Sequence, residues 1–229
     1  MEAPENTLAA FRHAISLGVR YVECDVQMSR DGQLVVIHDE TLDRTTNGTG
    51  PVRDYTFEEL RHFDAGAWFG PQFAGERIPS LREVVQLCAN NGIGLVIELK
   101  SPDVNVGVEQ KVAALVAEMW LQGVDNIWCI SFYHDIVRRM RALDPAAHLG
   151  YLYLPGNDFS QADDTVQAVC PYFGSALEHP EWVENAHARG KLVFVWTVNN
   201  RQDMLHLTRN GVDGIVSDSP SLLLETFGI

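Results

Sequence analysis

Two acidic side chains, spaced two residues apart in an apolar stretch, are the first candidates for chemistry in this sequence. The stretch Val22-Glu23-Cys24-Asp25-Val26 has the composition of a β-strand. Side chains alternate between the faces of a strand, so Glu23 and Asp25 share one face. Two neighbouring carboxylates on such a strand are costly unless a positive charge lies between them. The pattern predicts a metal site, with a salt bridge to a nearby Arg or Lys as the alternative.

Two further apolar runs end in an acid, a base and a cation. His38 follows Val35-Val36-Ile37, and a run from Leu95 leads to Glu98 and Lys100, which share a face. Histidine titrates near neutral pH and can pass a proton. The strand ends therefore predict one pocket that holds these side chains. The alternatives are a hydrogen-bonded core histidine and a simple ion pair between Lys100 and Glu98.

A fold that gathers strand ends at one edge is needed to bring these residues together. Apolar strands alternate with amphipathic helices, which is typical of a parallel sheet with helices outside. The later strands are predicted at 95–100, 126–132, 149–154, 167–173, 191–198 and 214–218. Roughly seven or eight such units favour a closed (β/α)8 barrel, the TIM barrel, over an open doubly wound sheet. No G-x-G-x-x-G motif opens a helix, which counts against dinucleotide binding. The polar residues at predicted strand ends, which would line the barrel mouth, are Glu23, Asp25, His38, Glu98, Lys100, Ser131, Trp196, Asn199 and Asp218.

The segment from about Asp54 to Pro79, called the cap segment below, interrupts this alternation. It contains a capping box, Thr56 with Glu59, followed by an aromatic, glycine-rich loop. A second capping box, Ser80 with Glu83, begins the next helix. We interpret the cap segment as an insertion near the site. Since no low-complexity linker divides the chain, residues 1–229 are predicted to form a single domain.

Composition counts against several classes of function. The chain has 229 residues, of which 46% are hydrophobic and 21% charged, as in ordinary globular proteins. A net charge of −14 would repel a phosphate backbone, so no nucleic acid partner is expected. No apolar run approaches the ~20 residues that span a bilayer and no signal segment opens the chain, which predicts a cytoplasmic protein. The widely spaced cysteines are predicted to be buried reduced thiols: Cys24, Cys88, Cys129 and Cys170.

A series of motifs, in order and at compatible spacing over nearly the whole chain, resembles the glycerophosphodiester phosphodiesterase family. The motifs are Ala3-Pro4-Glu5-Asn6-Thr7, Glu23-Cys24-Asp25-Val26, His38-Asp39, Leu42-Asp43-Arg44-Thr45-Thr46, Arg77-Ile78-Pro79-Ser80-Leu81, Glu98-Leu99-Lys100, Ser131-Phe132, Trp196-Thr197-Val198-Asn199 and Gly214-Ile215-Val216-Ser217-Asp218. The resemblance implies a TIM barrel, capped by the cap segment, that hydrolyses glycerophosphodiesters such as glycerophosphocholine or glycerophosphoethanolamine. The products would be glycerol 3-phosphate and an alcohol, which would place the protein in lipid and glycerol metabolism.

The resemblance also implies a role for each candidate residue. These roles are metal binding by Glu23, Asp25 and Glu98, proton transfer by His38 as one of two acid/base histidines, phosphate contact by Lys100 and substrate binding by Trp196. The implied cofactor is a divalent ion, Mg2+ or Ca2+, and an all-carboxylate site suits such hard cations better than zinc. For Trp196, a place in the barrel core is the alternative.

The N-terminus departs from the family pattern. That pattern begins with a first barrel strand ending in His-Arg-Gly, whereas this sequence starts at Met1, inside the connection that follows it. The second histidine and a phosphate-binding arginine are therefore missing, and neither His134 nor His179 is expected to replace the histidine. The barrel would have an open edge, which upstream residues or a second copy of the chain, as a homo-oligomer, could cover. Upstream residues could also include a signal peptide.

The sequence thus predicts an enzyme that acts on a small molecule, a metal-dependent glycerophosphodiester phosphodiesterase with acid/base catalysis at the barrel mouth. Two alternatives stay open. One is an impaired homologue that binds phosphodiesters without turnover. The other is a phospholipase acting on intact lipids, which would need an apolar rim around the mouth. The absence of a basic amphipathic segment counts against action at a membrane.

Overall fold

In the computed structural model, which describes residues 1–229, strand β1 (Tyr21–Met28) forms the centre of the first of two units. This unit comprises Met1–Ile127. Strand β3 (Gly94–Leu99) pairs with β1 in parallel, and β2 (Leu34–Val36) pairs with it antiparallel through a short turn. The register places Asp25 directly beside Glu98. The predicted alternation of Glu23 and Asp25 with buried apolar residues is confirmed, because Cys24 and Val26 are fully buried.

Three of the four helices of the first unit begin at a capping side chain. The four are α1 (Leu8–Leu17), α2 (Phe57–Leu60), α3 (Leu81–Asn90) and α4 (Val108–Trp120), with short 3-10 turns at Val52–Asp54 and Pro71–Phe73. Helix α4 begins without such a side chain, because its N-cap is Gly107. Both predicted capping boxes are present, one at the start of α2 and one at the start of α3. Helix α1 ends at Gly18, whose φ of 91° is the left-handed conformation that glycine adopts without strain.

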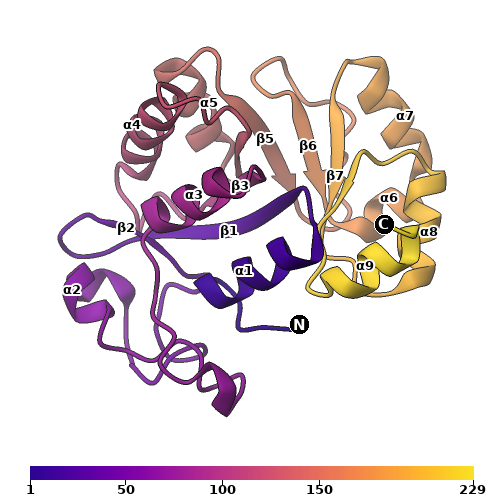
Figure 1. Cartoon of the computed structure of the whole chain (residues 1–229). Coiled ribbons are helices and arrows are strands. Elements are labelled where there is room, and N and C mark those ends of the chain that lie inside the picture. Colours follow the sequence, from indigo (N-terminus) through magenta and orange to yellow (C-terminus); the bar gives the residue numbers. More distant parts are fainter. The chain divides into compact units, whose positions relative to one another are not determined.

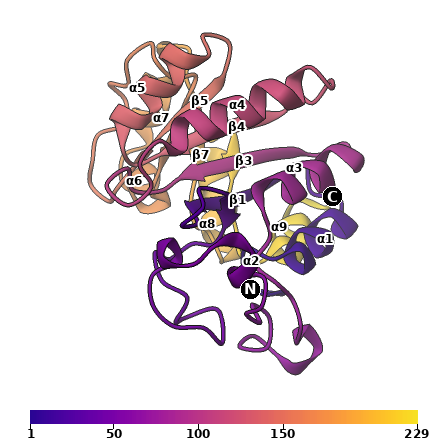
Figure 2. The same cartoon turned by 90° about the vertical axis from the view of Figure 1, so that its left-hand side faces the viewer.

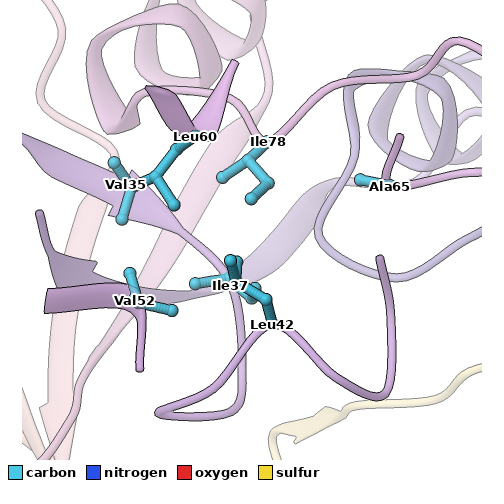
Figure 3. Close-up of a cluster of buried hydrophobic side chains, with 7 residues drawn as sticks. All are labelled: Val35, Ile37, Leu42, Val52, Leu60, Ala65 and Ile78. Atoms are coloured by element: carbon cyan, nitrogen blue, oxygen red, sulfur yellow. The ribbon is translucent and has the colours of Figure 1, made fainter. Parts of the chain in front are cut away.

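A cluster of buried side chains joins the cap segment to the end of β2 (Figure 3). Its members are Val35, Ile37, Leu42, Val52, Leu60, Ala65 and Ile78. Figures 1 and 2 show the cap segment, with α2, as largely irregular chain to one side of the strands of this unit. Because the cluster takes residues from both, the packing of the cap segment also fixes the chain that leads from β2 to His38.

The second unit, Trp128–Ile229, repeats strand and helix as the sequence predicts. Its five strands pair in parallel in chain order. They are β4 (Ile127–Ser131), β5 (His148–Tyr153), β6 (Ala168–Pro171), β7 (Leu192–Val195) and β8 (Gly214–Ile215). The first residue of β4 belongs to the first unit. Its helices are α5 (His134–Leu143), α6 (Phe173–Glu178), α7 (Pro180–Ala188), α8 (Arg201–Arg209) and α9 (Pro220–Phe227). Helices α6 and α9 were not predicted, and α6 begins where the strand was expected to end.

The last strands are shorter than predicted, although backbone hydrogen bonds continue past their ends: the Val216 N–H donates to the Val195 carbonyl and the Val198 N–H to the Val216 carbonyl, both at 2.9 Å. Asn199 follows β7, and its side-chain oxygen accepts the backbone N–H of Asp218 at 2.9 Å. The same side-chain amide donates to the Asp218 carboxylate at 2.8 Å. Backbone and side-chain hydrogen bonds together therefore satisfy the polar groups beyond the regular strands.

Two predictions from composition can be compared with the structure. All four cysteines are buried and none forms a disulfide, in agreement with the prediction of buried reduced thiols. None of the helices has both the length and the apolar composition that crossing a membrane requires. The single-domain organisation stays a prediction.

Candidate active site

The three predicted metal ligands lie together at the paired strands β1 and β3. Glu23 and Asp25 come from β1 and Glu98 from β3, and one ligand atom from each lies within 4.8 Å of the others. Strand pairing explains the proximity, because Asp25 and Glu98 are register partners and Glu23 is two residues from Asp25 on the same face. Side chains from one face of two adjacent strands therefore form the cluster, as the alternation in the sequence predicts.

Lys100 extends from the end of β3 into this carboxylate cluster. Its Nζ lies 2.7 Å from Asp25 Oδ1 and 2.7 Å from Glu98 Oε1, and only 14% of its side chain is exposed. Burial raises the pKa of Glu98 above its usual value, although the Lys100 ammonium acts in the opposite direction. Burial alone would lower the pKa of Lys100, but Asp25 and Glu98 raise it above its usual value. The ion pair that the sequence offered as an alternative thus forms, and it includes Asp25.

The net charge of the cluster is suited to a divalent cation. Three carboxylates and one ammonium leave two negative charges when all four groups are ionised. Carboxylate oxygens are the ligands that Mg2+ and Ca2+ prefer. A buried group of net negative charge is costly without a further cation. The residues present therefore fit such an ion, with Glu23, Asp25 and Glu98 as its ligands.

Asn6 holds Asp25 in place and was not singled out from the sequence. Its side-chain amide donates to Asp25 Oδ2 at 2.8 Å, and its side-chain oxygen accepts the Asp25 backbone N–H at 3.1 Å. Its φ of 56° lies in the left-handed region, which asparagine tolerates better than most residues. The signal available in the sequence was an asparagine directly before Thr7, the N-cap of α1. The first hydrogen bond holds the carboxylate that the Lys100 ammonium also contacts, and the second holds the backbone of the same residue.

His38 lies two residues beyond β2 and is anchored to β1 on either side. The backbone N–H of Ile37 donates to the Asp25 carbonyl at 3.0 Å, and the Gln27 amide donates to the His38 carbonyl at 3.0 Å. The imidazole is 53% exposed, with Nδ1 at 2.7 Å from Asp39 Oδ1. A positive charge on this ring would lower the pKa of Glu98. A small hollow next to His38 is lined by Glu5, Asn6, Val36, Ile37, Thr45, Thr46, Ala65 and Ile78.

Other histidines of the chain, including His134 and His179, have structural partners. In the first unit, His13 pairs with Glu2 at 2.8 Å and His62 contacts the Glu58 carbonyl at 2.8 Å. In the second unit, the His134 ring stacks on Tyr151 with ring centroids 3.9 Å apart. His179 likewise stacks on Trp182 at 4.0 Å. His38 is therefore the histidine that the first unit brings to the carboxylate cluster.

Trp196 belongs to the second unit, where it follows β7. Its indole N–H donates to the Cys170 carbonyl at 2.8 Å, and its ring lies edge-on to Phe132 with centroids 5.3 Å apart. Tyr172 makes a similar edge contact at 5.8 Å. The ring is half-buried among these aromatic neighbours. The predicted role of Trp196 in a substrate pocket stays a prediction.

Comparison with known proteins identifies the class to which this fold and site belong. The sequence model described as "Glycerophosphoryl diester phosphodiesterase family" matches residues 1–222. The chain belongs to this family, and it is therefore a member of a family of hydrolases. This agrees with the resemblance seen in the motifs.

Individual relatives are similar over almost the whole chain. A glycerophosphodiester phosphodiesterase of Caldanaerobacter subterraneus subsp. tengcongensis is 40% identical over 226 residues, covering 97% of this chain and 91% of the relative. A solved glycerophosphodiester phosphodiesterase from Agrobacterium tumefaciens has a TM-score of 0.82 at 31% identity, covering 98% of this chain and 94% of that chain. An Oleispira antarctica phosphodiesterase, solved in complex with its product sn-glycerol-3-phosphate, has a TM-score of 0.89 at 29% identity, covering 100% and 93%. The chain thus has the TIM-barrel fold class of its family, as predicted.

Proposed function

We propose that this chain hydrolyses glycerophosphodiesters, such as glycerophosphocholine or glycerophosphoethanolamine, to glycerol 3-phosphate and an alcohol, with Mg2+ or Ca2+ as cofactor. The observation that carries the proposal is the carboxylate cluster Glu23, Asp25 and Glu98, within 4.8 Å, with Lys100 inside it. The product complex of the Oleispira relative supports a substrate of this class.

The divalent ion, held by Glu23, Asp25 and Glu98, would supply positive charge to an anionic phosphodiester. Lys100 adds to this charge. Its ammonium has three N–H donors, two of which are directed to Asp25 and Glu98. The remaining donor is available for a phosphate oxygen. Neutralising the phosphate lowers the repulsion that an attacking oxygen meets.

His38 is the proposed acid/base group. Arg44, and to a smaller degree His38 itself, hold the pKa of Asp39 at about 2, so Asp39 is ionised at neutral pH. An ionised carboxylate only accepts hydrogen bonds, so the proton shared at 2.7 Å belongs to His38 Nδ1. The Nε2 atom of the neutral ring then carries the lone pair and can take a proton from, or return it to, an alcohol or water oxygen. Trp196 is proposed to contact the substrate.

The test is release of glycerol 3-phosphate from glycerophosphocholine by the purified chain with Mg2+, with Ca2+ and with EDTA. We expect activity with at least one ion and none in EDTA. His38→Ala should lower kcat about 10²- to 10⁴-fold, the usual contribution of a positioned acid/base group.

His62→Ala is the matched control, because His62 lies in the cap segment and contacts only a backbone carbonyl in the residues described. It should retain wild-type activity. A folded chain that releases no glycerol 3-phosphate with either ion, or one that is equally active in EDTA, would overturn the proposal.

A further inference from the structure

Arg44 lies between two acidic residues that come from separate parts of the first unit. Its Nη1 and Nη2 atoms each donate to one oxygen of Glu5 at 2.7 Å. On its other edge, Nε donates to Asp39 Oδ2 at 2.7 Å and Nη2 donates to Asp39 Oδ1 at 3.0 Å. The planar guanidinium thus makes two paired contacts at once, a geometry that a lysine ammonium cannot reproduce.

Asp39 connects this guanidinium to His38. Oδ1 of Asp39 lies 2.7 Å from His38 Nδ1, while Oδ2 accepts from Arg44 Nε. Since both carboxylate oxygens are engaged, the Asp39 side chain cannot rotate without breaking contacts to Arg44. The imidazole, which is more than half exposed, gains its orientation from this fixed carboxylate rather than from close packing. The same contact selects the tautomer, because Asp39 accepts the Nδ1 proton.

On its other edge, Arg44 contacts Glu5, which is next in sequence to a residue that holds the carboxylate cluster. Glu5 precedes Asn6, and the Asn6 side chain makes both hydrogen bonds to Asp25 described above. Arg44 therefore holds the loop behind a proposed metal ligand on one edge and the carboxylate behind the proposed acid/base group on the other.

We infer that Arg44 is a positioning residue that fixes the orientation and tautomer of His38 through Asp39, and ties that arrangement to the loop that holds Asp25. The inference rests on the proposed function, in which His38 transfers the proton. It assigns to Arg44 a role in turnover rather than in binding of the substrate. A group that orients an acid/base residue should affect kcat more than KM.

Two substitutions of Arg44 test this inference. Arg44→Gln removes the charge and most of the contacts, and Arg44→Lys keeps the charge but not the paired geometry. We expect both to lower kcat about 10- to 100-fold, a part of what proton transfer contributes. KM should change less than about threefold. Arg82→Gln is the matched control, because Arg82 on α3 makes an equally paired contact with Glu118 on α4, at 2.7 Å for both bonds, and neither residue contacts Asp39 or His38.

A readout independent of activity is the tautomer of His38, measured by the ¹⁵N chemical shifts of the imidazole. The wild-type ring and Arg82→Gln should show protonated Nδ1. Asp39→Asn should show exchange between both tautomers, because an amide can donate as well as accept. Arg44→Gln should show exchange as well, because the Asp39 carboxylate is then free to rotate away from Nδ1. Wild-type kcat in both Arg44 variants, or an unchanged tautomer in Arg44→Gln and Asp39→Asn, would overturn the inference. If the wild-type chain is inactive, the proposed function fails, while the tautomer measurement still tests the orientation.

Discussion

Asn6 offers a direct test of how the carboxylate cluster is held, through the substitution Asn6→Gly. Glycine keeps the left-handed backbone at φ 56° without strain and removes only the side chain with its two hydrogen bonds to Asp25. A hydrogen bond to a charged group contributes about 1.5–3 kcal/mol and one between neutral groups about 1 kcal/mol. Water can reach the half-buried position and replaces part of the free energy that these two hydrogen bonds contribute. We expect a loss of about 2 kcal/mol in the free energy of unfolding.

Asn6→Ala separates the backbone from the side chain. It removes the same hydrogen bonds and adds the cost of a left-handed alanine, about 1 kcal/mol, so it should be less stable than Asn6→Gly by that amount. Urea unfolding at pH 7 in EDTA measures both values. Asn91→Gly is the control, because Asn91 is exposed at the end of α3 and its side chain contacts only a backbone carbonyl there. It should lie within about 0.5 kcal/mol of wild type.

The two Asn6 variants, Asn6→Gly and Asn6→Ala, should also bind Mg2+ more weakly than the wild type. Groups that orient a metal ligand typically contribute 10- to 100-fold to affinity, so Asn6→Gly should raise the Mg2+ dissociation constant by about that factor in a calorimetric titration. A variant Asn6→Gly with wild-type stability and wild-type Mg2+ affinity would refute the reasoning that Asn6 fixes Asp25. Weaker Mg2+ binding by Asn91→Gly would show instead that the effect is not local to the cluster.

Three further predictions concern packing and the thiols. Leu42→Ala, at a fully buried position of the cluster behind His38, should cost about 2–5 kcal/mol in urea unfolding, and a loss below about 1 kcal/mol would contradict the packing described. Gly66→Ala would place Cβ 2.0 Å from the Phe73 carbonyl oxygen, so it should destabilise the chain by about 2–3 kcal/mol, measured by the same unfolding assay. Burial raises the pKa of Cys88 and Cys129 to about 12, which makes the thiolate scarce at pH 8. These thiols should therefore react with a disulfide reagent in denaturant but not in buffer, and rapid reaction in buffer would contradict their burial.

Local patterns in the sequence predicted the carboxylate cluster well. Strand alternation alone puts Glu23 and Asp25 on one face, and β1 pairing with β3 adds Glu98. The capping boxes at Thr56 and Ser80 were equally readable, because each depends on residues three apart. Where the physical cause lies within a few residues, the prediction and the structure agree.

Features that depend on distant contacts were not predicted. Arg44 and Glu5 are 39 residues apart in sequence, and no local pattern marks their contact. Asn6 and Asp25, 19 residues apart, form a second such pair. Helix α6 was missed for a different reason, since its first residue, Phe173, continues an apolar run that reads equally well as strand.

The cluster of buried side chains shared by β2 and the cap segment determines how this protein can be redesigned. A cap segment taken from a relative would have to supply partners that match Val35 and Ile37, because these residues pack against Leu60, Ala65 and Ile78. Residues 66–77 lie between two members of the cluster without belonging to it. That stretch can therefore be exchanged without replacing any member of the cluster that supports the chain leading to His38.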